Sequence, residues 1–332
     1  SGLSPAQQGF QFQWGKQGLH YRDRSRILAV FGLALLGAGL CAAFLGPIEI
    51  YCFYLFSEGG QFHYQGFGFG SFMFGNIASQ IIGYYLIAAV LIPLGFGHLR
   101  LRRWARTLSV ALLWFWLVVG VPLVILFMAV LVSSKEVTPA FAAGALVLLA
   151  LSYTLFPWLL IRFYKSHHVR GTFQAADHKS HWIEERPMAS LVTGSLFLFF
   201  AVVLHIPILF NGLYPVFGTW LSGLRGIVAL DLTILTMSVL GWGLLSHMRW
   251  AWWGGIVVLG ALMVSAISTL VLSSYLDLLA LAEFPLAELE FLQGVPAQGY
   301  HFALLVGLPM VVTWLVLAFS KRELTSPFEE SP

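Results

Sequence analysis

The chain has 332 residues, of which 58% are hydrophobic and only 10% are charged, with a formal net charge of +3. A soluble globular domain carries about 25% charged residues, so this composition excludes an ordinary water-soluble fold. Nucleic-acid binding is also disfavoured, because no basic stripe lies on a soluble module. The composition indicates an integral membrane protein, whose apolar surface is covered by lipid.

Eight apolar stretches are long enough to cross a bilayer. A membrane helix needs about 20 consecutive apolar residues. Such a stretch must be helical, because a single strand in lipid would leave its backbone groups unpaired. The predicted fold class is an all-α integral membrane protein with about eight transmembrane helices. The expected spans are residues 27–48, 77–97, 107–132, 139–163, 188–210, 226–246, 251–274 and 300–320.

The distribution of positive charge predicts the orientation of these spans. Lys and Arg favour the cytoplasmic side of a membrane. With the N-terminus placed inside, all of the 18 Lys and Arg except Lys135 and Arg225 fall in inner segments. A missed or invented span would mis-sort the charges that follow it. We therefore expect both ends of the chain in the cytoplasm, and a multi-pass protein of a bacterial-type cytoplasmic (inner) membrane.

Two stretches of the sequence indicate an internal repeat. A shift of 146 positions aligns Gly97 with Gly243 and residues 103–105 with residues 249–251, both of which read Arg-Trp-Ala. Each stretch joins the second and third span of a four-span half. The halves would then share one orientation, as in transporters built from parallel repeats. The alternative is a chance recurrence of a phrase common at the inner membrane interface.

The expected organisation is therefore two tandem four-helix halves with a loop between them. A short amphipathic helix, broken at Pro285, is expected in the last outer loop, residues 276–299. The first outer loop, residues 57–76, interleaves Phe with Gly; it either packs at the lipid headgroups or covers an outer pocket. The expected units are an N-terminal arm 1–26, a first half 27–164, a linker loop 165–187, a second half 188–320 and a tail 321–332.

The linker loop contains weak candidates for a metal site. His167, His178 and His181 lie near Asp177 in the sequence, and imidazole with carboxylate can bind zinc. Their spacing matches no known zinc pattern. The alternative is a solvated loop whose Lys and Arg contact anionic lipid headgroups.

A set of polar residues at membrane depth supplies the candidate pocket. Ionisable groups inside spans are costly and are functional candidates by default. Asp231 and His205 fall on consecutive antiparallel spans at matching depth, so contact between them is plausible. They would line an outward-facing pocket or, alternatively, hold two helices together as a structural pair. The full set, all in the outer third, is Asp231, His205, Glu49, His301, Arg225 and His63.

No nucleotide-binding or hydrolase motif occurs in the chain, which favours a non-catalytic role. The preferred function is a membrane subunit or scaffold of a larger complex that holds an apolar ligand such as a quinone, a pigment or a lipid. One alternative is a small-molecule transporter with an outward-facing pocket around Asp231 and His205. Another is an enzyme that modifies lipid in the outer leaflet.

The expected ligands and partners follow from this setting. Bound lipid or quinone is the expected cofactor class. Haem b is disfavoured, because His205 and His301 could supply two axial ligands only if the fifth and eighth spans touch. The expected partners are membrane lipid together with other membrane subunits or a second copy of the chain.

Overall fold

The computed structural model describes residues 21–57, 59–64, 66–133, 138–294 and 297–321. Within these ranges, eight helices are long and apolar enough to cross a membrane, and each predicted span falls on one of them. The prediction of a helical, multi-pass membrane protein is thereby confirmed. The arm up to residue 20, the tail from residue 322 and Lys135 lie outside the described residues.

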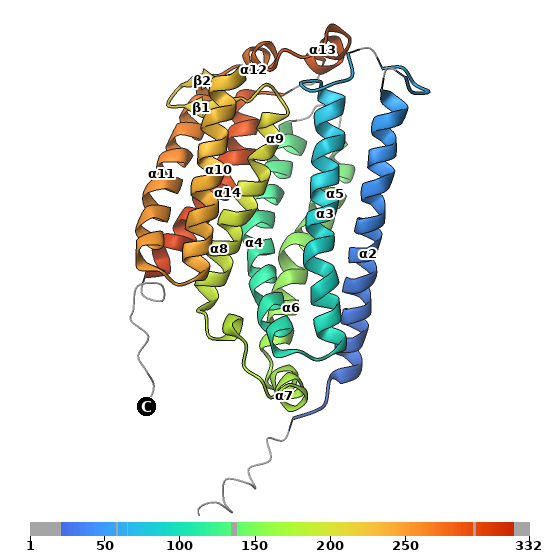
Figure 1. Ribbon diagram of the computed structural model, residues 1–332, viewed down its shortest axis with the longest axis vertical. Coiled ribbons are helices and arrows are strands. Elements are labelled where there is room, and N and C mark those ends of the chain that lie inside the picture. The colour runs from blue at the N-terminus through green and yellow to red at the C-terminus, as the bar shows by residue number, and fades with distance from the viewer. Residues whose placement is uncertain (1–20, 58, 65, 134–137, 295–296, 322–332) are drawn as a thin grey trace, which may run out of the picture.

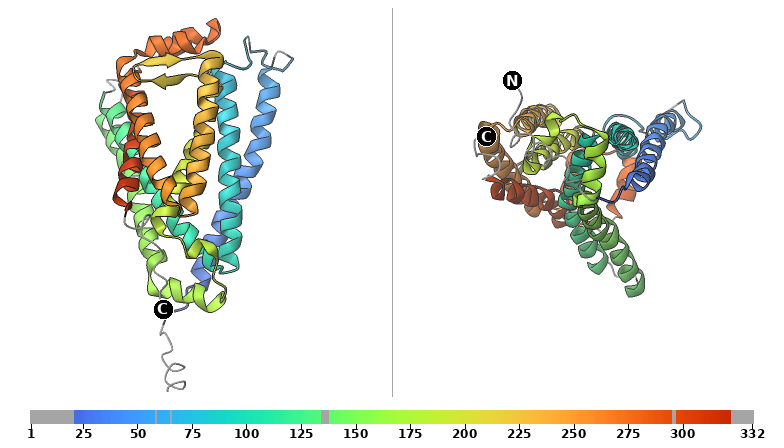
Figure 2. Two further views of the ribbon diagram at one scale, coloured as in Figure 1. Left: turned by 60° about the vertical axis from the view of Figure 1, so that its left-hand side comes forward. Right: turned by 90° about the horizontal axis from the view of Figure 1, so that it is seen from below.

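The first four spanning segments run alternately up and down the molecule (Figure 1). They are α2 (Ser25–Phe56), α3 (Phe72–Leu99), α4 (Arg103–Ser133) and a composite of α5 (Pro139–Ala150), the π-helical turn η1 (Leu151–Leu155) and α6 (Phe156–Lys165). In η1, Phe156 donates its N–H to the carbonyl of Leu151, five residues back. Pro157 follows directly and has no N–H to continue the regular ladder. No residue of α5 is buried, and α5 projects from the bundle (Figure 2).

The second four spanning segments follow a linker that is itself partly helical. The linker holds α7 (His167–Ala176) and the 3₁₀ turn η2 (Trp182–Glu184), so it is not the plain loop that we expected. The spans are α8 (Met188–Val203) continued by α9 (His205–Ile208), then α10 (Gly223–Leu245), α11 (Arg249–Leu272) and α14 (Gly299–Phe319).

Short elements close the end opposite α7. A hairpin of β1 (Tyr214–Val216) and β2 (Thr219–Leu221) pairs Tyr214 with Leu221, and it lies across the tops of α10 and α11 (Figure 2). The sequence did not predict this hairpin. The predicted helix broken at Pro285 is confirmed as two short helices, α12 (Tyr275–Ala282) and α13 (Leu286–Gln293), with Pro285 as the N-cap of α13.

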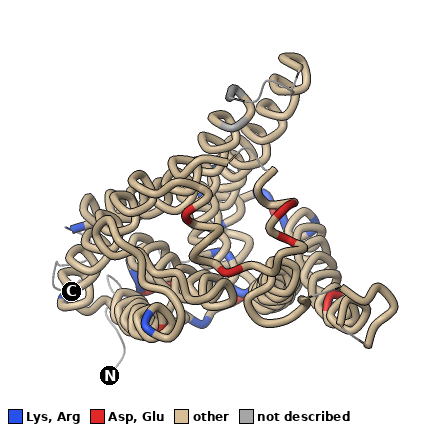
Figure 3. The backbone as a smooth tube through the Cα atoms, turned by 90° about the horizontal axis from the view of Figure 1, so that it is seen from above, with Lys and Arg blue, Asp and Glu red and all other residues tan. Residues whose placement is uncertain are grey.

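The two ends of the bundle differ in charge. The end that carries α7 and the α3–α4 and α10–α11 turns, here called the basic end, holds every described Lys and Arg except Arg225. The opposite end, here called the acidic end, carries α12 and α13 with Asp277, Glu283, Glu288 and Glu290. Figure 3 looks down on the acidic end.

Two helix pairs pack with their backbones in close contact. On α2 and α3, a Cβ added to Gly95 would lie 2.8 Å from the carbonyl oxygen of Gly32. On α8 and α10, a Cβ added to Gly241 would lie 3.2 Å from the carbonyl oxygen of Gly194. Small residues allow this close approach, which takes the place of a hydrophobic driving force between helices in lipid.

The α3–α4 and α10–α11 turns have the same backbone hydrogen bond. Arg102 donates its N–H to Gly97 at 2.8 Å, and Met248 donates its N–H to Gly243 at 2.9 Å. The residue before the donor has a left-handed φ in both turns, 48° at Leu101 and 58° at His247. All three pairs of positions are related by the shift of 146 that aligns the sequence.

Helix α4 joins the two groups of spans. It packs against α3 and α6 on one side and against α8 and α14 on the other. Between the groups lies a buried cluster to which α4 contributes Ala111 and Val118, and α8 contributes Leu191, Val192 and Leu196. The first two turns of α4 therefore stand at a junction of α6, α7, the linker and α8.

Candidate functional site

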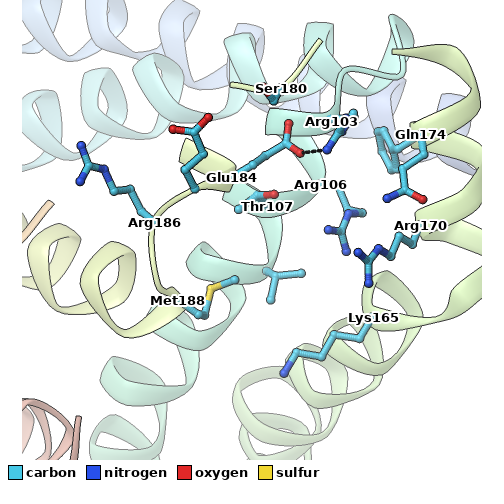
Figure 4. A pocket seen from close by; sticks show the side chains of 13 residues that line it. Arg103, Arg106, Thr107, Lys165, Arg170, Gln174, Ser180, Glu184, Arg186 and Met188 are labelled. Atoms are coloured by element: carbon cyan, nitrogen blue, oxygen red, sulfur yellow. Dashed lines mark ion pairs between the residues drawn. The ribbon is translucent and has the colours of Figure 1, made fainter. Parts of the chain in front are cut away.

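A cavity of about 360 Å³ lies at this junction, at the basic end. It is formed where α4 begins, where α6 ends and where the linker crosses to α8. Charged side chains dominate its wall, and most of them are labelled in Figure 4: Arg103, Arg106, Lys165, Arg170, Arg186, Glu184 and Glu185. We call this cavity the basic pocket.

One face of α4 supplies the central wall of the basic pocket. Arg103, Arg106, Thr107 and Val110 all line it. Their spacing of three, four and seven residues places them on one side of a helix. This face is turned toward the linker, and the cations at its start are therefore directed into the cavity.

Asp177 fastens the linker to the start of α4. Its buried carboxylate accepts the backbone N–H of Arg103 at 3.2 Å, which satisfies a donor that the first turn of a helix leaves open. The Arg102 guanidinium lies 3.6 Å away. Burial of the carboxyl group raises its pKa, but the N–H groups of Arg103 and Lys179, the hydrogen bond to His181 and the charge of Arg102 together outweigh that effect, so the pKa of Asp177 lies below its ordinary value of 3.8.

A buried hydrogen-bonded group supports the pocket from behind. His98 on α3 is fully buried; its Nδ1 lies 2.8 Å from the Leu94 carbonyl and its Nε2 lies 2.8 Å from the Tyr164 hydroxyl. The Phe173 ring, which lines the pocket, packs edge-on against His98 at 5.8 Å. These contacts join α3, α6 and α7. They also fix the position of Lys165, which follows Tyr164 at the end of α6.

The positive charges of the pocket are only partly balanced. Arg103 forms an ion pair with Glu184 at 2.7 Å. Among the described residues, Arg106, Arg170 and Lys165 have no ion pair with an acid. Arg106 donates to the Tyr164 carbonyl at 3.4 Å and experiences the positive charges of Arg170 and Arg103 together with the negative charge of Glu184. In Figure 4, the guanidinium groups of Arg106 and Arg170 face each other.

Comparisons with known proteins assign no function to this pocket. No protein-family model, curated protein or solved structure matches the chain. The chemistry of the pocket follows from its own side chains. Guanidinium groups are rigid, permanently charged donors that bind oxyanions through paired hydrogen bonds. The cluster, whose positive charge is only partly compensated, therefore suits an anion that has several oxygen atoms.

The structure places the predicted pair Asp231 and His205 on exposed surfaces of α10 and α9. Nδ1 of His205 lies 2.9 Å from the carbonyl of Ala201, one turn back. Within the described residues, no hydrogen bond or ion pair joins Asp231 to His205. A pocket formed by these two residues stays a prediction.

The other predicted polar residues lie apart from one another. Glu49 is half-buried on α2, Arg225 is exposed at the start of α10, and His63 is exposed in the first outer loop with a φ of 45°. His301 is half-buried; its Nδ1 accepts the Gln298 N–H at 3.1 Å, and its buried Nε2 has no hydrogen-bond partner among the described residues. A haem held by His205 and His301 would require the fifth and eighth spans to touch. Helices α8 and α14 do touch, but this contact alone does not bring the two imidazoles to one haem.

The metal candidates of the linker are separated in the structure. His181 lies 3.4 Å from the Asp177 carboxylate, whereas His167 and His178 are exposed. The part of the chain that the structure describes contains no cluster of three His, Cys, Asp or Glu side chains able to hold a metal ion.

Proposed function

We propose that the chain is a non-catalytic subunit or scaffold of a bacterial-type cytoplasmic membrane, and that the basic pocket binds an oxyanion. The observation that carries the proposal is that Arg106, Arg170 and Lys165 line one cavity, and that none of them forms an ion pair with an acid among the described residues. Like charges repel, so such a cluster is stabilised when an anion occupies it.

The proposed orientation places the basic end in the cytoplasm. Its support is the excess of Lys and Arg in the segments at that end, which is the pattern of cytoplasmic loops. Arg225 is the one described exception. In this orientation the basic pocket is reached from the cytoplasm or from the inner leaflet.

We also propose that the chain arose as two tandem four-helix halves. The matching turns at Gly97 and Gly243 support the duplication. The pattern of helix contacts supports it as well, because α2 packs on α3 as α8 packs on α10, and α4 packs on α6 as α11 packs on α14. The basic pocket lies beside the linker that joins these halves, at a place where a subunit could sense or hold a ligand.

Thermal unfolding of the purified full chain in detergent tests the anion site, with inorganic pyrophosphate as the probe. We expect pyrophosphate to raise the unfolding midpoint of the wild type, because a ligand bound only to the folded state stabilises it. The double variant Arg106→Gln, Arg170→Gln should lose this response. Arg249→Gln, an exposed cation at the same end outside the pocket, should keep it. Equal responses in the wild type and the double variant would overturn the proposal.

A further inference from the structure

We infer that the anion in the basic pocket is the phosphate of an anionic phospholipid whose acyl chains remain in the bilayer beside α4 and α6. This inference rests on the proposed anion site and names its ligand. A free phosphate shares the headgroup chemistry, so three features decide between the two sources: the depth of the pocket, its contact with the exposed Trp114, and its apolar wall.

The depth of the pocket matches the position of a lipid headgroup. Its wall is built from the ends of three spanning segments: the first turns of α4, the last residue of α6 and the first residue of α8. The ends of membrane helices mark the boundary between hydrocarbon and headgroups. A phosphate at Arg106 would therefore lie at the level that lipid phosphates already occupy.

Lys165 connects the wall of the pocket with an exposed side chain on the surface of α4. Lys165 lines the pocket, and its ammonium group lies over the Trp114 ring at 5.4 Å from the centroid. Trp114 is 37% exposed on α4, about 16 Å below Arg103 at the helical rise of 1.5 Å per residue. A Trp under a Lys in this setting presents an apolar face to acyl chains and a cation to the phosphate.

The wall itself is amphiphilic. Val110, Phe173 and Met188 line the pocket next to the arginines. A small inorganic anion makes no use of apolar contacts, whereas the glycerol and first methylene groups of a lipid would bury against them. The lining thus fits a ligand that is charged at one end and apolar at the other.

The charge of the pocket selects among headgroups. Five cations and two acids line it, an excess of three positive charges: Arg103, Arg106, Lys165, Arg170 and Arg186 against Glu184 and Glu185. A zwitterionic headgroup would bring its own ammonium group into this excess and be repelled. An anionic headgroup brings only negative charge, so phosphatidylglycerol should bind in preference to phosphatidylcholine.

Native mass spectrometry of the full chain, with phosphatidylglycerol or phosphatidylcholine added to detergent micelles, tests the inference. We expect the wild type to retain phosphatidylglycerol and not phosphatidylcholine. The double variant Arg106→Gln, Arg170→Gln should bind phosphatidylglycerol at least about tenfold more weakly, because two charge-assisted contacts are lost. Arg249→Gln should bind like the wild type. In the wild type, pyrophosphate should displace the lipid. This measurement does not depend on whether any variant folds.

Trp114→Ala separates the lipid from the free anion. Removal of the ring should weaken retention of phosphatidylglycerol far more than stabilisation by pyrophosphate, because Arg106 and Arg170 stay in place and only the ring beneath Lys165 is lost. Two results would overturn the lipid inference and leave the anion site standing, provided that pyrophosphate stabilises the wild type. The first is equal binding of the two lipids. The second is retention of phosphatidylglycerol that is unchanged in both the arginine double variant and Trp114→Ala. If the arginine changes alter neither stabilisation by pyrophosphate nor retention of lipid, the anion site and the lipid inference are both overturned.

Discussion

Gly37 and Gly39 lie two positions apart on α2 and have different surroundings. A Cβ at Gly39 would lie 2.8 Å from the Ile92 side chain and 2.9 Å from its backbone nitrogen, whereas a Cβ at Gly37 would meet nothing within 4 Å. The difference follows from the face that α2 turns toward α3. Residues that look alike in the sequence therefore contribute differently to stability.

Gly39→Val should destabilise the protein by about 1–3 kcal/mol, because the added methyl groups force α2 and α3 apart. Gly37→Val introduces the same side chain at an exposed position of α2 and should leave the stability of the protein almost unchanged. Thermal unfolding of the two variants in the same detergent checks this expectation. Similar losses in both variants would show that α2 and α3 do not pack through Gly39.

Asp177 gives the linker a dependence on pH. Its pKa in the folded protein lies below the ordinary value of 3.8. The charged carboxylate therefore contributes stability that is present above about pH 4 and is lost as pH falls through the depressed pKa. The linker should release from α4 only under acidic conditions below that range.

Asp177→Asn should remove this pH dependence and loosen the linker at neutral pH by roughly 1–3 kcal/mol, the usual effect of losing hydrogen bonds to a charged acceptor. Hydrogen exchange of residues 167–187 as a function of pH measures it. Glu185→Gln, a change of an exposed acid in the same linker, serves as the control. A linker equally protected in the Asp177 variant would contradict the role given to this carboxylate.

Among the elements, α13 stabilises the start of α3 from a distance of more than two hundred residues. The buried Glu288 carboxylate accepts the N–H groups of Phe72 at 2.6 Å and Met73 at 3.0 Å. These donors have no partner within their own helix, and a negative charge at a helix N-terminus is favourable. Asp177 does the same for α4 at the other end of the bundle.

Glu288→Gln should speed hydrogen exchange at the first turn of α3 by about tenfold, because it removes the charge from the cap. Glu290→Gln changes an exposed acid on the same short helix and should leave that turn protected. Exchange measured by mass spectrometry on peptides covering residues 72–76 decides between them. Unchanged exchange in both variants would remove the capping role.

The spanning elements could be predicted from the sequence because each is decided locally, by about 20 apolar residues in a row. The first span nevertheless runs to Phe56 and not to residue 48, since nothing at Glu49 ends the helix. The β1–β2 hairpin was missed because its support is tertiary: Phe217 and Gly218 donate their N–H groups to Ser265 and Thr269 on α11.

At the scale of the whole molecule, the basic pocket could not be located from the sequence. Its cations lie at the ends of spans, where Lys and Arg are expected from the orientation alone. In the sequence they are therefore indistinguishable from ordinary cytoplasmic flanking charges. Arg106 and Arg170 meet only because α7 folds under α4, which no local pattern reveals. A usable signal was the spacing of Arg103 and Arg106, which share one helical face at the very start of a span.

We propose that the spans alternate across the membrane with the basic end in the cytoplasm. Labelling of single cysteines in intact cells tests it most directly, after Cys41 and Cys52, both free thiols, are changed to Ser. The exposed positions Lys179, in the linker, and Glu290, on α13, are replaced by Cys one at a time. A membrane-impermeant maleimide should label Glu290→Cys in intact cells and Lys179→Cys only after permeabilisation. Labelling of both positions from the same side would contradict this orientation.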